Sequence, residues 1–214
     1  MRMNSIFNHV IITVLLLASC TREDIKIACV GDSITEGAGL AYQNRTAYPT
    51  RLDSILGPGF AVMNFGRSGT TLLKKADFPY WTCKEFYDVF EYQPDIIIIK
   101  LGSNDSKPFN WNADDFARDY QALIDTFNTI ASRPSIFLCL PVPVYKTAWG
   151  INDSTVTAGV IPIIEMVAGK NHLPVIDLYH SMKTQPENFP DGVHPNEGGA
   201  LVMAEIVARE LKLK

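Results

Sequence analysis

The feature that most constrains the fold is a run of four isoleucines, Ile96 to Ile99. The run lies between Pro94 and Gly102, two residues that interrupt regular structure. β-Branched side chains favour extended backbone, and an uninterrupted apolar run is typical of a strand that is buried on both faces. Because both faces must be covered, residues 95–101 are predicted to form a central strand of a parallel sheet with helices on either side.

The rest of the chain alternates between two kinds of segment. Four further apolar runs are predicted to be strands, at residues 25–30, 60–65, 135–140 and 173–178. Segments with helical spacing of apolar residues follow the strands, at residues 48–56, 83–92, 114–132, 155–168 and 196–213. This alternation predicts one α/β domain over residues 21–214, with a five-stranded parallel sheet between two layers of helices.

The first 20 residues differ from the rest. A basic start at Arg2, a short apolar run and a small-residue exit indicate a secretory signal peptide, too short to span a bilayer comfortably. The exit Leu17-Ala18-Ser19-Cys20 resembles the lipobox of bacterial lipoproteins, in which the cysteine is lipidated. We therefore expect export to the bacterial cell envelope, with a lipid anchor on Cys20 at the periplasmic or outer surface. The alternative is an ordinary cleaved signal or short anchor, with Cys20 incidental.

Charge and cysteine content exclude several classes of function. The chain of 214 residues carries a net charge of -4 and has no lysine or arginine cluster, so no nucleic-acid partner is expected. Cys29, Cys83 and Cys139 show no metal-binding spacing, and neither a metal nor a cofactor is expected. Cys29 and Cys139 lie in apolar runs and are predicted to be buried, while nothing supports a disulfide at Cys83. The sequence leaves the oligomeric state open.

Polar loops follow three of the predicted strands, at residues 31–37, 66–71 and 102–106. In a parallel sheet, functional groups gather where the carboxyl ends of the strands lead into helices. Ser33 lies in the first loop, two residues beyond a strand. A serine there is either a helix N-cap or a nucleophile, and a nucleophile needs a base oriented by a carboxylate.

The end of the chain offers such a base. Asp191 and His194 lie three residues apart in a loop rich in proline and glycine, just before the last helix. A turn there would let the carboxylate bind one ring nitrogen while the other faces outward. The alternative is a capping turn with an exposed histidine. His172 and His180 lie in polar turns, and no carboxylate is expected beside either ring.

Four sequence blocks in this order resemble the SGNH hydrolases, also called GDSL esterases. They are Gly31-Asp32-Ser33-Ile34-Thr35-Glu36-Gly37, Asn64-Phe65-Gly66-Arg67-Ser68-Gly69, Gly102-Ser103-Asn104-Asp105 and Asp191-Gly192-Val193-His194-Pro195. The resemblance spans residues 25–213 and implies a flavodoxin-like three-layer α/β/α sandwich. It also implies Ser33 as nucleophile, His194 as general base and acid, and Asp191 as the carboxylate that orients it.

The resemblance further implies an oxyanion hole for the charge that develops during acyl transfer. Its donors would be the backbone amides of Ser33 and Gly69 and the side-chain amide of Asn104. Gly66 is the alternative to Gly69, which is chosen because it lies five residues after Asn64. The family often has aspartate after this glycine, where this chain has Thr70.

Two features favour a carbohydrate ester as the substrate. The block after the third strand resembles GDSL proteins of carbohydrate-degrading bacteria, some of which are sialate O-acetylesterases. Aromatic residues also occur in the loops expected around the site, and mixed aromatic and polar walls suit sugars. These residues are Tyr80, Trp81, Trp111, Tyr145 and Trp149, of which the last three are predicted to contact substrate. For each of them, ordinary packing is the alternative.

We therefore predict a serine esterase that removes O-acetyl groups from carbohydrate, such as sialic acid or a polysaccharide. One alternative is a lysophospholipase or acyl-thioesterase of the same fold, since the family includes both. Another is a glycan-binding protein without activity. The presence of all four residues Ser33, Asp191, His194 and Asn104 argues against that last alternative.

Overall fold

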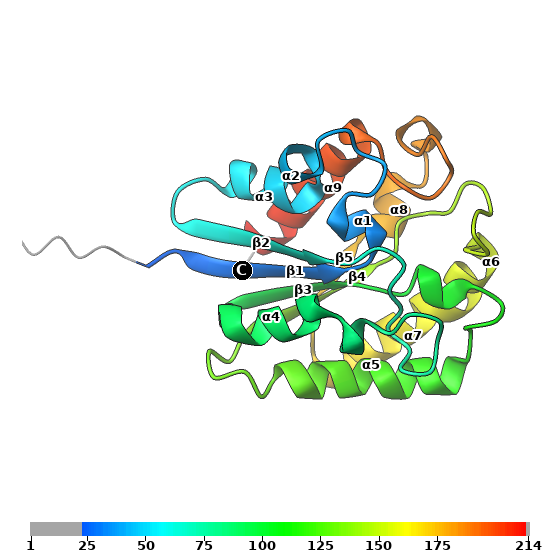
Figure 1. Ribbon diagram of the computed structural model, residues 1–214, viewed down its shortest axis with the longest axis horizontal. Helices are drawn as coiled ribbons and strands as arrows, with labels where there is room; N and C mark the ends of the chain where they lie inside the picture. The colour runs from blue at the N-terminus through cyan, green and yellow to red at the C-terminus, as the bar shows by residue number, and fades with distance from the viewer. Residues whose placement is uncertain (1–22, 213–214) are drawn as a thin grey trace, which may run out of the picture.

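The computed structural model describes residues 23–212, so the predicted signal segment and Cys20 lie outside the described residues. Within that range, one parallel sheet has the strand order β2-β1-β3-β4-β5 (Figure 1). The strands are β1 (Ile25–Gly31), β2 (Phe60–Gly66), β3 (Ile96–Lys100), β4 (Ser135–Leu140) and β5 (Val175–Asp177). The isoleucine run forms the middle strand, and Ile97, Ile98 and Ile99 are fully buried, as predicted.

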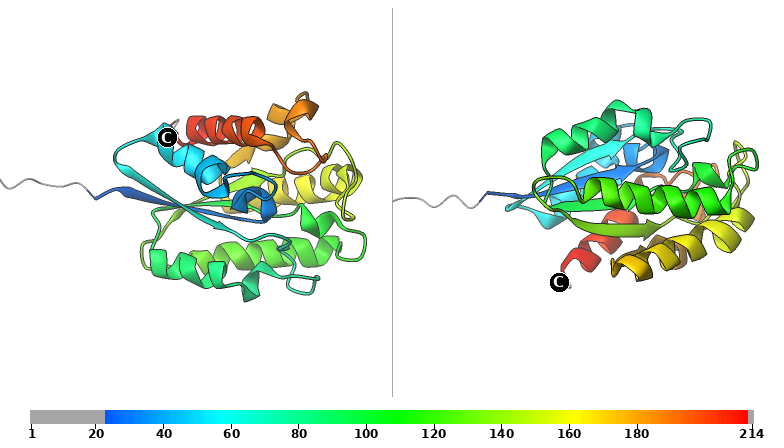
Figure 2. Two further views of the ribbon diagram at one scale, coloured as in Figure 1. Left: turned by 45° about the horizontal axis from the view of Figure 1, so that its top comes forward. Right: turned by 90° about the horizontal axis from the view of Figure 1, so that it is seen from below.

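Helices cover both faces of the sheet. They are α1 (Ser33–Glu36), α2 (Gln43–Thr46), α3 (Tyr48–Leu56), α4 (Lys84–Tyr92), α5 (Ala113–Phe127), α6 (Asp153–Thr155), α7 (Ile161–Asn171), α8 (Leu178–Met182) and α9 (Glu197–Lys212). Helices α4, α5 and α7 lie on one face, and α3, α8 and α9 lie on the other (Figures 1 and 2). Each layer packs its own hydrophobic cluster against the sheet, which confirms the predicted three-layer fold.

Two predicted elements end earlier than expected. The helix predicted to reach Ser132 ends at Phe127, after which the amides of Thr129 and Ile130 donate to carbonyls three residues back, in tight turns. Ser132 donates its hydroxyl to the Pro94 carbonyl, and Arg133 has a φ of 53°, which no helix continues. The last strand stops at Asp177, whose side chain accepts the amide of His180 and so starts α8.

The helix predicted over residues 155–168 is divided. It consists of α6, a π-helical turn over Val156–Val160, and α7. Pro162 explains the break, since its nitrogen carries no hydrogen to donate to the preceding turn. Short 3-10 turns lie at Tyr80–Thr82, Asn104–Ser106 and Pro186–Asn188.

Strand register brings three polar loops to the same edge of the sheet. Gly31 at the end of β1 pairs with Gly66 of β2 on one side and with Lys100 of β3 on the other. The loops that follow these strands therefore begin side by side. This edge is where the candidate site lies.

The three cysteines within residues 23–212 are buried free thiols. Cys29 and Cys139 lie in the core beneath α3 and α9, as their apolar surroundings predicted. In the same range, no helix combines the length and the apolar character needed to cross a membrane.

Candidate active site

Strand β1 runs almost directly into α1, which places Ser33 in the first turn of a short helix. Asp32 is the N-cap, since its Oδ1 accepts the amide of Ile34 at 3.0 Å. The capping role considered for Ser33 therefore belongs to its neighbour. Gly31 makes the tight turn possible, because a Cβ there would lie 2.1 Å from Oγ1 of Thr35.

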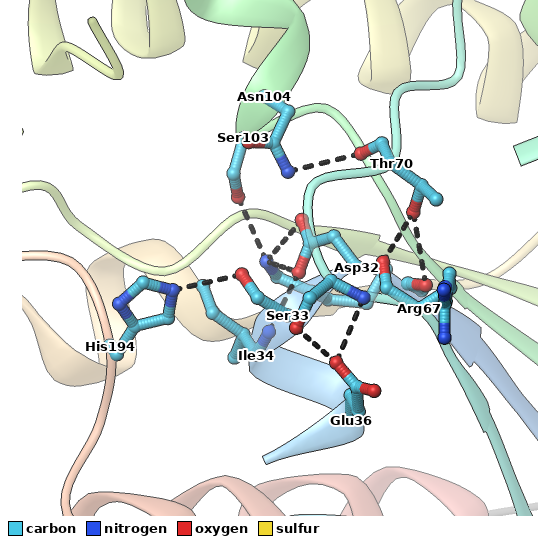
Figure 3. Close-up of polar contacts among 12 residues, drawn as sticks. Asp32, Ser33, Ile34, Glu36, Arg67, Thr70, Ser103, Asn104 and His194 are labelled. Carbon is cyan, nitrogen blue, oxygen red and sulfur yellow. Dashed lines mark hydrogen bonds and ion pairs between the residues drawn. The ribbon is translucent and has the colours of Figure 1, made fainter. Parts of the chain in front are cut away.

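Three side chains form a hydrogen-bonded chain at this turn. Oγ of Ser33 lies 2.9 Å from Nε2 of His194 (Figure 3). On the other side of the ring, Nδ1 lies 2.8 Å from Oδ2 of Asp191. Because a carboxylate only accepts, Nδ1 carries the proton in the neutral ring and Nε2 accepts from Ser33. This arrangement lets the imidazole take up the hydroxyl proton.

The loop before α9 holds the carboxylate in place. Oδ1 of Asp191 accepts the amides of Val193 at 2.8 Å and His194 at 2.7 Å, which leaves Oδ2 for the ring. Burial raises the pKa of Asp191, but the two amides and the His194 ring lower it more, so that it lies below the ordinary value. Asp191 is thus ionised at neutral pH. Gly192 has a φ of 86°, which suits glycine in this turn.

The structure distinguishes the two glycines considered for the oxyanion hole. The amide of Gly66 donates to Oδ1 of Asn64 at 2.9 Å. The amide of Gly69 has no acceptor among residues 23–212, and its φ is 83°. Asn104 uses its side-chain amide to donate to the Thr70 carbonyl at 3.0 Å, which leaves a second hydrogen for another acceptor.

Glu36 and Ser68 contribute to the site in a way that sequence reasoning missed. Oε2 of Glu36 accepts the amide of Ser68 at 2.9 Å and also its hydroxyl. The side-chain amide of Asn64 binds the Thr35 carbonyl at 2.8 Å. These contacts tie α1 to the loop that carries Gly69. Glu36 and Ser68 each lie within one of the sequence blocks that resemble the family, but neither block alone predicts that the two residues bind each other across two loops.

Lys100 and Asp32 form a buried ion pair directly behind Ser33, which sequence reasoning also missed. Nζ of Lys100 lies 3.0 Å from each carboxylate oxygen of Asp32, and both side chains are fully buried. The available signal was a lysine at the end of an otherwise apolar central strand.

The aromatic residues divide into packed and exposed groups. Tyr80 is buried and donates to the Phe65 carbonyl, and the Trp81 indole donates to the Leu72 carbonyl. Trp111 packs against Phe116 with ring centroids 5.4 Å apart. Each of the three is engaged within the protein.

Tyr145 and Trp149 lie on one loop but differ in their surroundings. The Tyr145 hydroxyl donates to the Met182 carbonyl, and its ring packs on Phe189. Trp149 is 62% exposed, and its ring centroid lies 5.2 Å from that of His194, edge to face. Trp149 therefore combines solvent exposure with contact to the catalytic histidine candidate.

One expectation about the other histidines was wrong. His180 was expected to lack a carboxylate beside its ring, but Nδ1 lies 2.9 Å from Oδ2 of Asp177. The error arose because residues 173–178 were predicted as a continuous strand, which would point these side chains apart. The start of α8 at Leu178 instead turns His180 back toward its N-cap.

A hollow of about 320 Å³ lies beside the hydrogen-bonded chain. It is lined by His194, Asp191 and residues 38–41, among others. Larger hollows lie along β2 and at the opposite end of the sheet, and none of the three chain residues lines them. We therefore assign the candidate site to the smaller hollow, because His194 and Asp191 line it.

Residues 29–201 match the model of the GDSL-like lipase/acylhydrolase family. The chain belongs to this family. The matched residues include Ser33, Asp191 and His194, and the match confirms the resemblance found in the sequence.

Individual relatives are named as carbohydrate and aryl esterases. The chain is 39% identical over 211 residues to an acetylxylan esterase of Xylanibacter ruminicola, covering 89% of this chain and 44% of the relative. It thus spans under half the length of that protein.

Solved structures of related fold include a carbohydrate acetylesterase from Sinorhizobium meliloti, with a TM-score of 0.75, 18% identity, and coverage of 88% of this chain and 98% of that one. An aryl esterase of M. smegmatis has a TM-score of 0.72 and 20% identity, with coverage of 88% and 98%. These two likenesses establish the fold alone.

Proposed function

We propose that this protein is a carboxylic ester hydrolase that removes O-acetyl groups from carbohydrate. The observation that carries the proposal is the chain of hydrogen bonds from Ser33 through His194 to Asp191, with distances of 2.9 and 2.8 Å. Family membership and the acetylxylan esterase relative support the same reaction class.

The proposed reaction has two halves. His194 accepts the Ser33 proton as Oγ attacks the acetyl carbonyl, and then returns that proton to the sugar oxygen as the ester bond breaks. A water molecule next gives its proton to His194 and attacks the acetyl-enzyme. The proton returns to Oγ of Ser33, and acetate leaves. Asp191 stays ionised throughout and stabilises the imidazolium in both halves, in keeping with its lowered pKa.

Three donors are proposed to stabilise the tetrahedral intermediates. They are the amides of Ser33 and Gly69 and the remaining side-chain hydrogen of Asn104. The first two have no acceptor among residues 23–212, and the third is oriented by Thr70. Fixed donors of this kind need no reorganisation as negative charge develops, and removal of one typically slows the reaction by about 10²- to 10³-fold.

The sugar that carries the acetyl group is proposed to be part of a polysaccharide such as xylan. The name of the Xylanibacter relative favours this substrate over sialic acid. Among the predicted substrate contacts, we assign this role to Trp149 and assign packing roles to Trp111 and Tyr145. A ring beside His194 is suited to stack on an apolar sugar face.

We also propose export and lipidation at Cys20, on the basis of the lipobox resemblance. Expression of the full chain in a bacterium fed a clickable palmitate analogue tests this. Labelling of the parent and loss of label in Cys20→Ala are expected, whereas equal labelling of both would contradict it.

Acetate release is the direct test of function. Purified parent is expected to release acetate from acetylated xylan faster than from O-acetylated sialic acid, and to prefer p-nitrophenyl acetate to the octanoate. Ser33→Ala is the control for contaminating esterases. A strong preference for the octanoate would favour the lysophospholipase or thioesterase alternative. Glycan binding without any Ser33-dependent release would favour the non-enzymatic one.

A further inference from the structure

Lys100 is the last residue of β3, at the carboxyl end of the middle strand of the sheet. Its ammonium group donates to both carboxylate oxygens of Asp32 at 3.0 Å and to Oγ of Ser103 at 2.8 Å. These three contacts use all three hydrogens of the group. In Figure 3, dashed lines from the Asp32 carboxylate and from the Ser103 hydroxyl meet at one nitrogen.

A charge in this position is costly to bury. Lysine almost never lies fully inside a protein, and a buried ion pair often contributes no more to stability than apolar side chains of similar volume. The surrounding strand is apolar, and Ile98 and Ile99 are fully buried. Apolar side chains in place of the whole pair would suit that environment, whereas loss of the lysine alone leaves the buried Asp32 carboxylate without its counter-ion. Stability of the fold alone therefore does not account for the presence of the pair.

The two partners of Lys100, Asp32 and Ser103, belong to the two turns that carry catalytic candidates. Asp32 caps α1 and directly precedes Ser33, whose amide and hydroxyl are both proposed to act in catalysis. Ser103 directly precedes Asn104, the side-chain donor of the proposed oxyanion hole. Backbone pairing between β1 and β3 ends at Gly31 and Lys100, just before both turns. Beyond that point, the ammonium is the group that joins them directly.

We propose that Lys100 is a positioning residue that sets the separation between the Ser33 turn and the Asn104 turn. This inference rests on the proposed esterase function. Two of the oxyanion donors belong to the two turns that the ammonium group joins, and their geometry must match a tetrahedral oxygen to within a fraction of an ångström. Loss of the link therefore weakens binding of the transition state more than binding of the ester.

The main test is the Lys100→Met variant with p-nitrophenyl acetate. A fall in kcat of about 10²-fold or more is expected, with KM within about threefold of the parent value, because oxyanion donors act mainly in the transition state. The rate of labelling by a fluorophosphonate is expected to fall in parallel. An unchanged kcat in folded Lys100→Met would overturn the proposal.

Ser103→Ala provides a second test that disturbs the core less. It leaves the pair of Lys100 and Asp32 intact but releases the Asn104 turn from the ammonium group. A fall in kcat of about tenfold with unchanged KM is expected, a smaller loss because only one of the three contacts is removed. Parent-like kcat in Ser103→Ala would contradict the positioning role, even if Lys100→Met failed to fold.

Lys107→Met is the matched control. The side chain of Lys107 is also buried and forms an ion pair with Asp77 at 3.1 Å. Its backbone amide caps the Asn104 turn, which the substitution leaves in place, but its ammonium group binds neither catalytic turn. Its loss is expected to lower the melting temperature while kcat stays within about threefold of the parent value. An equal loss of kcat in both lysine variants would assign a general structural role to Lys100. Failure of the proposed function itself would appear separately, as activity in the parent that does not depend on Ser33.

Discussion

Residues 23–212 contain two Asp–His pairs of the same local design. In each, the aspartate lies three residues before the histidine, accepts its backbone amide and binds Nδ1, at 2.8 Å for Asp191–His194 and 2.9 Å for Asp177–His180. Each histidine also meets an aromatic ring edge to face at 5.2 Å, from Trp149 in one pair and Tyr179 in the other.

The pairs differ in what lies opposite the other ring nitrogen. Nε2 of His194 faces Oγ of Ser33, and the His194 side chain is 15% exposed. The His180 side chain is 60% exposed, and its Nε2 has no partner among residues 23–212. Local spacing is thus sufficient to orient an imidazole. A catalytic arrangement also requires a nucleophile brought from 161 residues away.

The largest expected effect separates the two histidines. His194→Gln is expected to reduce kcat/KM for p-nitrophenyl acetate by about 10⁴-fold or more, because the general base is lost. His180→Gln is the matched control and is expected to keep activity within about twofold of the parent. Comparable losses in steady-state assays of both variants would refute the assignment of His194.

The two aspartates should differ almost as much. Asp191→Asn is expected to reduce kcat by about 10³- to 10⁴-fold, because an amide does not stabilise the imidazolium and favours the wrong tautomer. Asp177→Asn makes the same change at the exposed pair and is expected to leave kcat unchanged. Stopped-flow or steady-state rates at neutral pH check both, and a fall of less than about tenfold in Asp191→Asn would argue against its role.

The aromatic partners of the two histidines are expected to affect different properties, activity for Trp149 and stability for Tyr179. Trp149→Ala is expected to reduce kcat/KM on acetylated xylan about tenfold with little change in melting temperature, because the ring is exposed. Tyr179→Ala should instead lower the melting temperature and leave kcat/KM near the parent value, because the Tyr179 ring is buried and its hydroxyl donates to the Asp153 carboxylate. Calorimetry and acetate release distinguish the two. A large loss of stability in Trp149→Ala would point to packing.

The smallest effect concerns acid stability. The folded state lowers the pKa of Asp191, so the stabilisation from its ionised form is present above the pKa of the unfolded chain, about 3.9. It is lost as pH falls through the folded value. The free energy of unfolding of Asp191→Asn is therefore expected to lie below that of the parent at pH 6, with the gap closing as pH falls through the lowered pKa of folded Asp191. Denaturant titrations at several pH values measure this, and a gap that does not change with pH would count against it.

Prediction from sequence succeeded where a signal is local or repeated. The isoleucine run and the strand–helix alternation were enough for the layers and for all five strands, because burial on two faces leaves few choices of side chain. It was less accurate at the ends of elements. Tight turns after Phe127 and the N-cap at Asp177 ended two elements early, and periodicity reports neither.

The sequence by itself determined the fold class, the family and the residues that are candidates for catalysis. Only the tertiary structure decided which Asp–His pair meets a serine, which glycine has a free amide, and how Lys100 joins two turns. The physical reason is the distance along the chain over which each interaction acts. Periodicity and capping act over a few residues, whereas the site is assembled by strand register, which brings the ends of β1, β2 and β3 to one edge.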